Sequence, residues 1–160
     1  ISSKDDLVLC ALKETVVSKE YLSWMRDYEV VKFTEQRHSI QNIHTIREYV
    51  VKKYKSECDL LMGIYSSEKH IGNVKLGDID VNNLTATVSY IIGNKSYWNK
   101  GIGTKVIGMV VEIAFQKLSF SKGQFTTKIQ SAACNARSGG SILKTRGNSC
   151  ICLSGSSNPI

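Results

Sequence analysis

The chain has 160 residues, of which 42% are hydrophobic and 22% charged, the balance of one globular domain. No apolar run reaches the roughly 20 residues that a membrane-spanning helix needs, and no signal-peptide pattern occurs, so a cytoplasmic protein is expected. The formal charge of +7 suits an anionic partner, although it also suits simple solubility. The lysines are scattered and no arginine-rich run occurs, which argues against a nucleic-acid surface.

The cysteines give no sign of a disulfide framework or of a metal site. Their number is odd, no two of them are spaced as Cys-x-x-Cys, and the three histidines are far from any cysteine pair. We therefore expect no bound metal.

The first half of the chain contains one apolar strand, two amphipathic helices and then two further strands. Ser18 is the expected N-cap of the first helix, because its hydroxyl can accept a hydrogen bond from a free amide. Either Ser39 or Asn42 would cap the second helix. The pattern predicts strands over 7–12, 59–65 and 70–78 and helices over 19–26 and 43–54.

The second half contains a strand, a glycine turn and a long helix in direct succession. Residues 85–92 are dense in β-branched and aromatic side chains, which is typical of a strand. A polar loop over 93–99 follows, and after Thr104 apolar residues recur at helical spacing. A further strand is expected over 124–133.

Glycines at the start of a helix allow a ligand to approach backbone N–H groups that no earlier turn has satisfied. These donors and the helix dipole favour a negatively charged group such as phosphate, so Gly101 and Gly103 predict a phosphate site. The alternative is a tight turn that holds nothing. The order of residues excludes a P-loop, and Val106 stands where the dinucleotide fingerprint needs its third glycine.

Residues 97–104, Tyr-Trp-Asn-Lys-Gly-Ile-Gly-Thr, resemble motif A of the GNAT acetyltransferase superfamily. The similarity is to the branch of ribosomal-protein N-terminal and amino-sugar acetyltransferases, with Asn99 in place of a glycine. The resemblance implies an α+β fold in which helices flank a central, mostly antiparallel mixed sheet.

The resemblance also implies acetyl-CoA as the co-substrate. In the family, the backbone of the strand before the motif pairs with the pantetheine arm, and the amides of the turn hold the pyrophosphate. The implied cofactor-binding residues are Tyr90, Ile91, Ile92, Trp98, Asn99, Lys100, Gly101, Ile102, Gly103 and Thr104, with Asn135 and Ser138 further along the chain.

Two registers are open for that later segment. Without a gap, Ser138 stands where the family has asparagine; in the second register Asn135 takes that role and Ser138 a later serine position. Ser141 best fits the family's leaving-group acid, although it could equally be a helix N-cap. The base is less defined, since Thr87 stands where many relatives have glutamate. The candidates by place in the chain are Glu35, His38, Asp78 and Asp80.

The resemblance ends near residue 144. We therefore expect an acetyltransferase domain over 1–144 and an irregular tail over 145–160, with the last family strand missing or altered. A missing strand would leave a sheet edge open, which would favour a homodimer.

The sequence thus predicts an N-acetyltransferase that moves an acetyl group from acetyl-CoA to a primary amine by direct attack in a ternary complex. The acceptor would be a small molecule or a peptide. Two alternatives stay open. One is a CoA-binding module without turnover, and the other is a basic nucleic-acid-binding domain that rests on charge alone.

Overall fold

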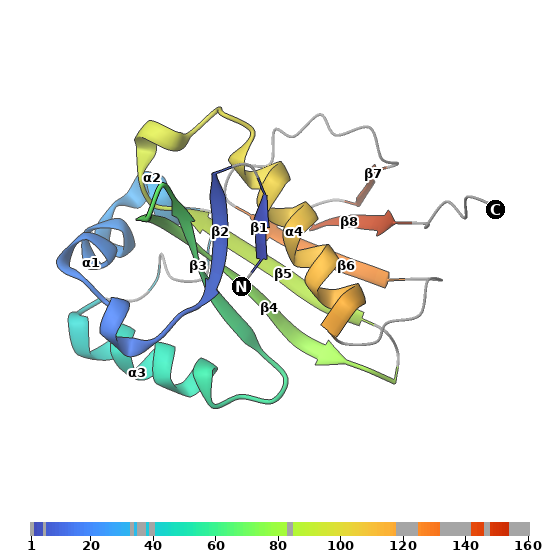
Figure 1. Cartoon of the computed structure of the whole chain (residues 1–160), viewed down its shortest axis with the longest axis horizontal. Helices are drawn as coiled ribbons and strands as arrows, with labels where there is room; N and C mark the ends of the chain where they lie inside the picture. Colours follow the sequence, from blue (N-terminus) through green and yellow to red (C-terminus); the bar gives the residue numbers. More distant parts are fainter. Residues whose placement is uncertain are drawn as a thin grey trace.

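A computed structural model describes residues 2–4, 6–32, 34, 38, 41–82, 85–117, 125–131, 142–145 and 148–153. Within these residues the strands form one sheet in the order β1-β2-β3-β4-β5-β6-β8-β7 (Figure 1). The strands are β1 Ser2–Lys4, β2 Leu7–Ala11, β3 Leu60–Ser66, β4 Lys69–Asp80, β5 Thr85–Ile92, β6 Phe125–Ser131, β7 Ile142–Thr145 and β8 Asn148–Leu153.

The helices are short apart from α3 and α4. Their bounds are η1 Glu14–Val16, α1 Lys19–Arg26, α2 Tyr28–Val31, α3 Ile43–Tyr54, η3 Lys95–Tyr97 and α4 Ile102–Lys117. The predicted ranges 19–26 and 43–54 are confirmed exactly. Ser18 Oγ accepts from the Tyr21 N–H, and Asn42 Oδ1 accepts from the amides of His44 and Thr45.

Every neighbouring pair in the sheet is antiparallel except β5 and β6, which run parallel. A parallel pair needs a crossover, and α4 lies in the connection between these two strands. The predicted α+β fold with a mixed, mostly antiparallel sheet is therefore confirmed.

The sheet is covered on both faces. On one face, α4 buries Val106, Met109 and Val110 against residues of β2 to β5 such as Val88. On the other face, α1, α2 and α3 surround a second apolar cluster that Leu12 and Leu61 join from the sheet. Because side chains alternate along a strand, β5 contributes Tyr90 to the α4 face and Ile91 to the α1 face.

The chain after residue 141 differs from the expectation. The helix that Ser141 would begin as an N-cap is not formed, because Ile142–Thr145 is strand β7. The irregular tail is wrong over Asn148–Leu153, which is strand β8 and pairs with β6. The available edge of β6 explains the difference, because a strand that pairs there satisfies backbone groups whatever its local composition.

The missing strand from which the homodimer was inferred is therefore wrong, because β8 is present, and the dimer stays a prediction without that premise. The domain boundary at residue 144 also stays a prediction. None of the described helices is long and apolar enough to cross a membrane.

His70 lies inside a group of aromatic rings on the α1 face of the sheet. Its ring centroid is 5.1 Å from those of Tyr65 and Trp24 and 6.0 Å from that of Tyr21. Burial lowers the pKa of His70, and its hydrogen bond with Asn73 only partly opposes this. The neutral imidazole is therefore the form that the fold favours.

We expect this histidine to make the fold less stable under mild acid. As the pH falls through the ordinary imidazole pKa near 6.5, the unfolded chain takes up a proton that folded His70 resists, so the free energy of unfolding decreases. Urea unfolding between pH 5 and pH 8 should show a smaller decrease for His70→Gln than for the wild type. Equal decreases in the two proteins would contradict this assignment.

Candidate functional site

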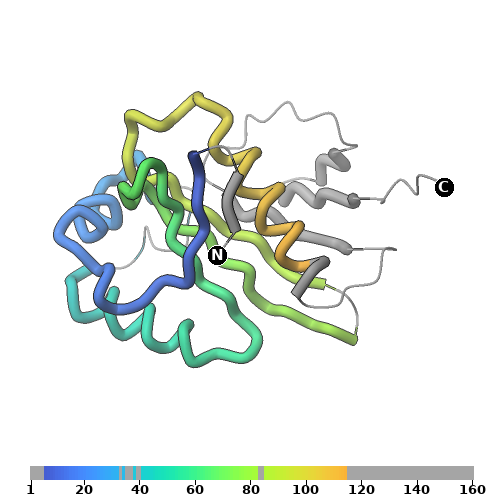
Figure 2. Tube along the Cα trace, in the orientation of Figure 1, coloured from blue at the N-terminus to red at the C-terminus, as the bar shows by residue number. Residues whose placement is uncertain are grey.

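The connection from β5 to α4 makes a turn that ordinary side chains disfavour. Asn99 has φ +61° and Gly101 has φ +71°, both in the left-handed region. Asparagine is among the few residues that tolerate this region, which is why Asn99 can stand where the family has glycine. Figure 2 shows the segment, in yellow, rising from the end of β5 and turning back into α4.

The two glycines of the turn are needed for different reasons. A Cβ at Gly101 would meet nothing within 4 Å, so this side of the turn is open. A Cβ at Gly103 would lie 2.5 Å from Tyr90 Oη and 2.9 Å from Tyr90 Cζ. Gly103 therefore lets the helix pack against the buried Tyr90 ring, whereas Gly101 leaves room in front of the helix.

The first turn of α4 presents backbone donors. Its first helical hydrogen bond runs from the Lys105 N–H to the Gly101 carbonyl oxygen, at 3.2 Å. Within the described residues, no backbone oxygen accepts from the N–H groups of Ile102, Gly103 or Thr104. These donors and the dipole of a 16-residue helix favour the binding of an anion. The pyrophosphate of acetyl-CoA would be such an anion.

Two lysines lie in the segment between β5 and α4. Lys100 Nζ lies 5.5 Å from the centre of the Tyr97 ring, and Lys95 Nζ lies 5.8 Å from that of Trp98. Lys95 also forms an ion pair with Asp27 at 2.6 Å, and its hydrogen bond lowers the pKa of that carboxyl group. The pair joins the turn to the end of α1.

Trp98 holds the end of β5. Its Nε1–H donates to the Ile92 carbonyl oxygen at 2.8 Å, and its ring packs against the apolar cluster under α1 to α3. One residue beyond Ile92, Gly93 lies so close to the Trp24 indole that a Cβ would overlap the ring. The two tryptophans thus fix where the chain leaves the sheet.

The last two residues of β5 extend beyond the described pairing with β6. The final pair is Tyr90 with Ser131, whereas Ile91 and Ile92 pair only with Asn73 and Gly72 of β4. We call Ile91 and Ile92 the free end of β5. Among the described strands, nothing pairs with their β6 side.

The structure brings together the predicted cofactor-binding residues that it describes, 90–92 and 98–104. The helix begins with Ile102, Gly103 and Thr104, and the ring of Tyr90 packs against Gly103. Glu35, Asn135, Ser138 and Ser141 lie outside the described residues, so the roles and the two registers expected for them stay predictions.

The other candidate bases lie away from this turn or on the surface. Asp80 pairs with Thr85 at the start of β5, and the exposed Asp78 is nearby, at the opposite end of the strand from Ile92. His38 is also exposed. Among residues with described side chains, no three of His, Cys, Asp and Glu gather as a metal site would require.

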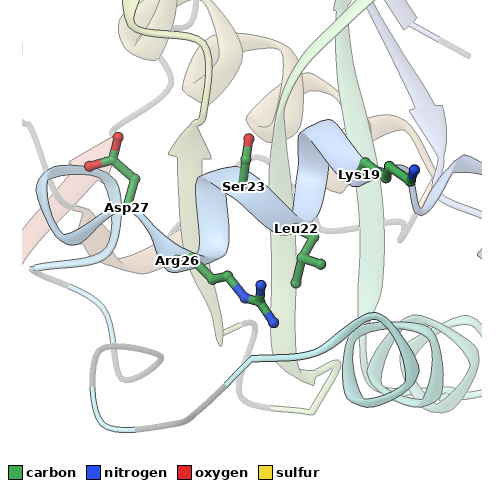
Figure 3. A pocket seen from close by; sticks show the side chains of 5 residues that line it. All are labelled: Lys19, Leu22, Ser23, Arg26 and Asp27. Atoms are coloured by element: carbon green, nitrogen blue, oxygen red, sulfur yellow. The ribbon is translucent and has the colours of Figure 1, made fainter.

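The exposed side of α1 has an open hollow of about 460 Å³. Figure 3 shows its five lining residues, with Ser23 and Asp27 directed to one side of the helix and Leu22 and Arg26 to the other. Arg26 Nε donates to the Gln41 carbonyl oxygen at 3.0 Å, which ties α1 to the segment before α3. Lys19 completes the lining.

Two features of this region were not predicted from the sequence. They are the ion pair of Asp27 with Lys95 and the contact of His70 with Asn73, whose Nε2 and Oδ1 are 2.9 Å apart. A polar Asn73 between Gly72 and Val74 in a buried strand was the available signal, because buried polar side chains usually have a partner.

The fit between Gly103 and Tyr90 predicts a specific energetic coupling. Gly103→Ala should destabilise the fold by about 1–3 kcal/mol, because the added methyl group overpacks the contact with the ring. Tyr90→Phe removes the nearest atom, so the double variant should recover part of that loss in a urea-unfolding cycle. Strict additivity of the two changes would show that the contact does not constrain α4.

The comparisons with known proteins agree with this geometry. The chain matches the family model described as "Acetyltransferase (GNAT) domain" over residues 7–144. No curated protein matches it. Among solved structures, a chimera of the Vibrio cholerae spermidine N-acetyltransferase SpeG with hSSAT is similar at a TM-score of 0.64 and 17% identity, over 78% of this chain and 70% of that chain.

Two further structures show the same fold. The microcin C7 self-immunity acetyltransferase MccE, in complex with acetyl-CoA and AMP, has a TM-score of 0.64 at 21% identity, over 78% of this chain and 70% of that one. A probable acetyltransferase has a TM-score of 0.65 at 17% identity, over 83% and 73%. With the family model spanning most of the sequence, the chain belongs to the GNAT acetyltransferases and is an acetyl-CoA-dependent acyltransferase.

Proposed function

We propose that the chain transfers an acetyl group from acetyl-CoA to a primary amine by direct attack in a ternary complex. The main support is the position of three free amides at the start of α4 beside the free end of β5. The amides of Ile102, Gly103 and Thr104 suit a pyrophosphate, and the open side of Gly101 leaves space for it.

The cofactor and the acceptor would bind on different sides of the end of β5 in this proposal. The cofactor supplies an activated thioester, and backbone groups of Ile91 and Ile92 would hold its pantetheine arm and donate to the oxygen on which charge develops. The acceptor would approach from the α1 face, where Trp24 and Asp27 lie near the end of β5. Ser141 as the donor to the leaving thiolate and Glu35 as the base stay part of the proposal.

The acceptor class within the family is also a proposal. Ribosomal N-termini and amino sugars follow from the sequence resemblance, whereas the structural neighbours include enzymes that are named for spermidine. Neither similarity identifies the acceptor of this chain.

The test is the release of free thiol from acetyl-CoA in the presence of a panel of primary amines. Amine-dependent release, with the acetylated product found by mass spectrometry, supports the proposal. A thermal shift with CoA but no release with any amine would favour the alternative of a CoA-binding module, which Thr87 in place of the family's glutamate supports. Salt-dependent retardation of DNA or RNA without any response to CoA would favour the third function.

The anion site itself is tested by Gly101→Glu. The substituted carboxylate would project into the open space in front of the helix and repel a pyrophosphate, so the Kd for CoA should rise at least about tenfold. Gly108→Glu controls for the added charge, because Gly108 is also open but lies further along α4, and Gly101→Gln controls for the strain that any side chain causes at the positive φ of Gly101. Calorimetry that finds the same CoA affinity in the two glutamate variants would place the cofactor elsewhere.

A further inference from the structure

Asn73 is a polar residue in the buried part of β4. It is 7% exposed and lies directly opposite Ile91, the first residue of the free end of β5. Ile91 packs toward the cluster under α1 to α3, and side chains of paired residues point to the same face of a sheet. Asn73 therefore lies on the face from which the acceptor would approach.

His70 sets the orientation of the Asn73 carboxamide. His70 Nε2 is 2.9 Å from Asn73 Oδ1, a contact that is a hydrogen bond in the tautomer with the proton on Nε2, because a carboxamide oxygen only accepts. The stacked Tyr65 ring and the neighbouring Trp24 ring hold the imidazole in place. In the structure the carboxamide thus has its oxygen toward His70 and its NH₂ group away from it.

That NH₂ group has no partner in the described part of the molecule. The bond with His70 is the hydrogen bond of the Asn73 side chain, and Asn73 Nδ2 is not among the fully enclosed atoms that lack one. Buried donors are normally satisfied, so an oriented pair of N–H donors that still reaches solvent is suited to bind a ligand.

The surroundings connect this donor with the proposed transfer site. Trp24 contacts both the ring of His70 and the backbone of Gly93, the residue that follows the free end of β5. The donor, its positioning residue and the end of β5 thus form one packed unit on the α1 face.

We propose that Asn73 Nδ2 donates a hydrogen bond to a hydroxyl or carbonyl oxygen of the acceptor, close to its reacting amine, and so determines acceptor specificity. The inference rests on the proposed acetyl transfer. An N–H donor needs a lone pair, which an ammonium group lacks, so Asn73 disfavours oxygen-free polyamines. The formal charge of +7 acts in the same direction. Such an oxygen lies next to the amine as a hydroxyl group in 2-amino sugars and as a carbonyl group at peptide N-termini.

The variant Asn73→Asp tests this directly, since it keeps an oxygen for His70 and replaces the donor by an acceptor. Its kcat/KM should fall at least about tenfold for glucosamine or alaninamide and should not fall for cyclohexylamine or spermidine, while the KM for acetyl-CoA stays unchanged. A loss confined to glucosamine identifies a sugar acceptor, and one confined to alaninamide identifies a peptide N-terminus. Asn82→Asp is the matched control, because it makes the same change at an exposed asparagine just after β4.

An equal loss with all four amines would overturn the proposal, because a merely structural role of Asn73 affects every acceptor alike. A second measurement does not depend on turnover or on the folding of the variant. In the ¹⁵N-labelled wild type, glucosamine or alaninamide should shift the Asn73 side-chain NH₂ signals and cyclohexylamine should not. Unmoved signals would overturn the donor role, whereas absence of thiol release in the wild type with these shifts present would reject only the acetyl transfer.

Discussion

The contact between Tyr90 and Gly103 is the constraint on which the site depends. Because Gly103 has no Cβ, the start of α4 can approach the ring of Tyr90 on β5 closely. The approach places the N–H groups that start the helix next to Ile91 and Ile92, which lack a partner on the β6 side among the described strands. One packing contact thereby combines the backbone donors at the start of α4 with the end of β5, the two features on which the proposed cofactor site rests.

A second set of contacts connects the segment between β5 and α4 to α1. Trp98 holds the Ile92 carbonyl, Lys95 pairs with Asp27 at the end of α1, and Trp24 packs on Gly93. The ion pair is partly exposed, so we assign it an orienting role rather than a large contribution to stability. The tryptophan contacts are better protected from solvent, and they hold the loop between β5 and η3 against the helices α1 to α3.

Local signals in the sequence were reliable where one element determines its own limits. Ser18 and Asn42 begin helices because their side chains accept from amides two or three residues away. The strand over 85–92 and the helix after the glycine turn follow from periodicity and β-branched composition. The segment 148–153 shows the opposite case, because pairing with a distant β6 makes it a strand although its composition suggests a tail.

The sequence by itself therefore determined the order of the main elements from β2 to β6, the position of the glycine turn before α4 and the family. These depend on interactions between residues close together along the chain, and on a motif of eight consecutive residues. Only the tertiary structure decided that Gly103 serves packing while Gly101 serves the open site, and that His70 orients Asn73 opposite Ile91. The physical reason is that such assignments depend on which strands are neighbours and on which face each side chain lies, and one strand's local pattern does not contain its partner's register.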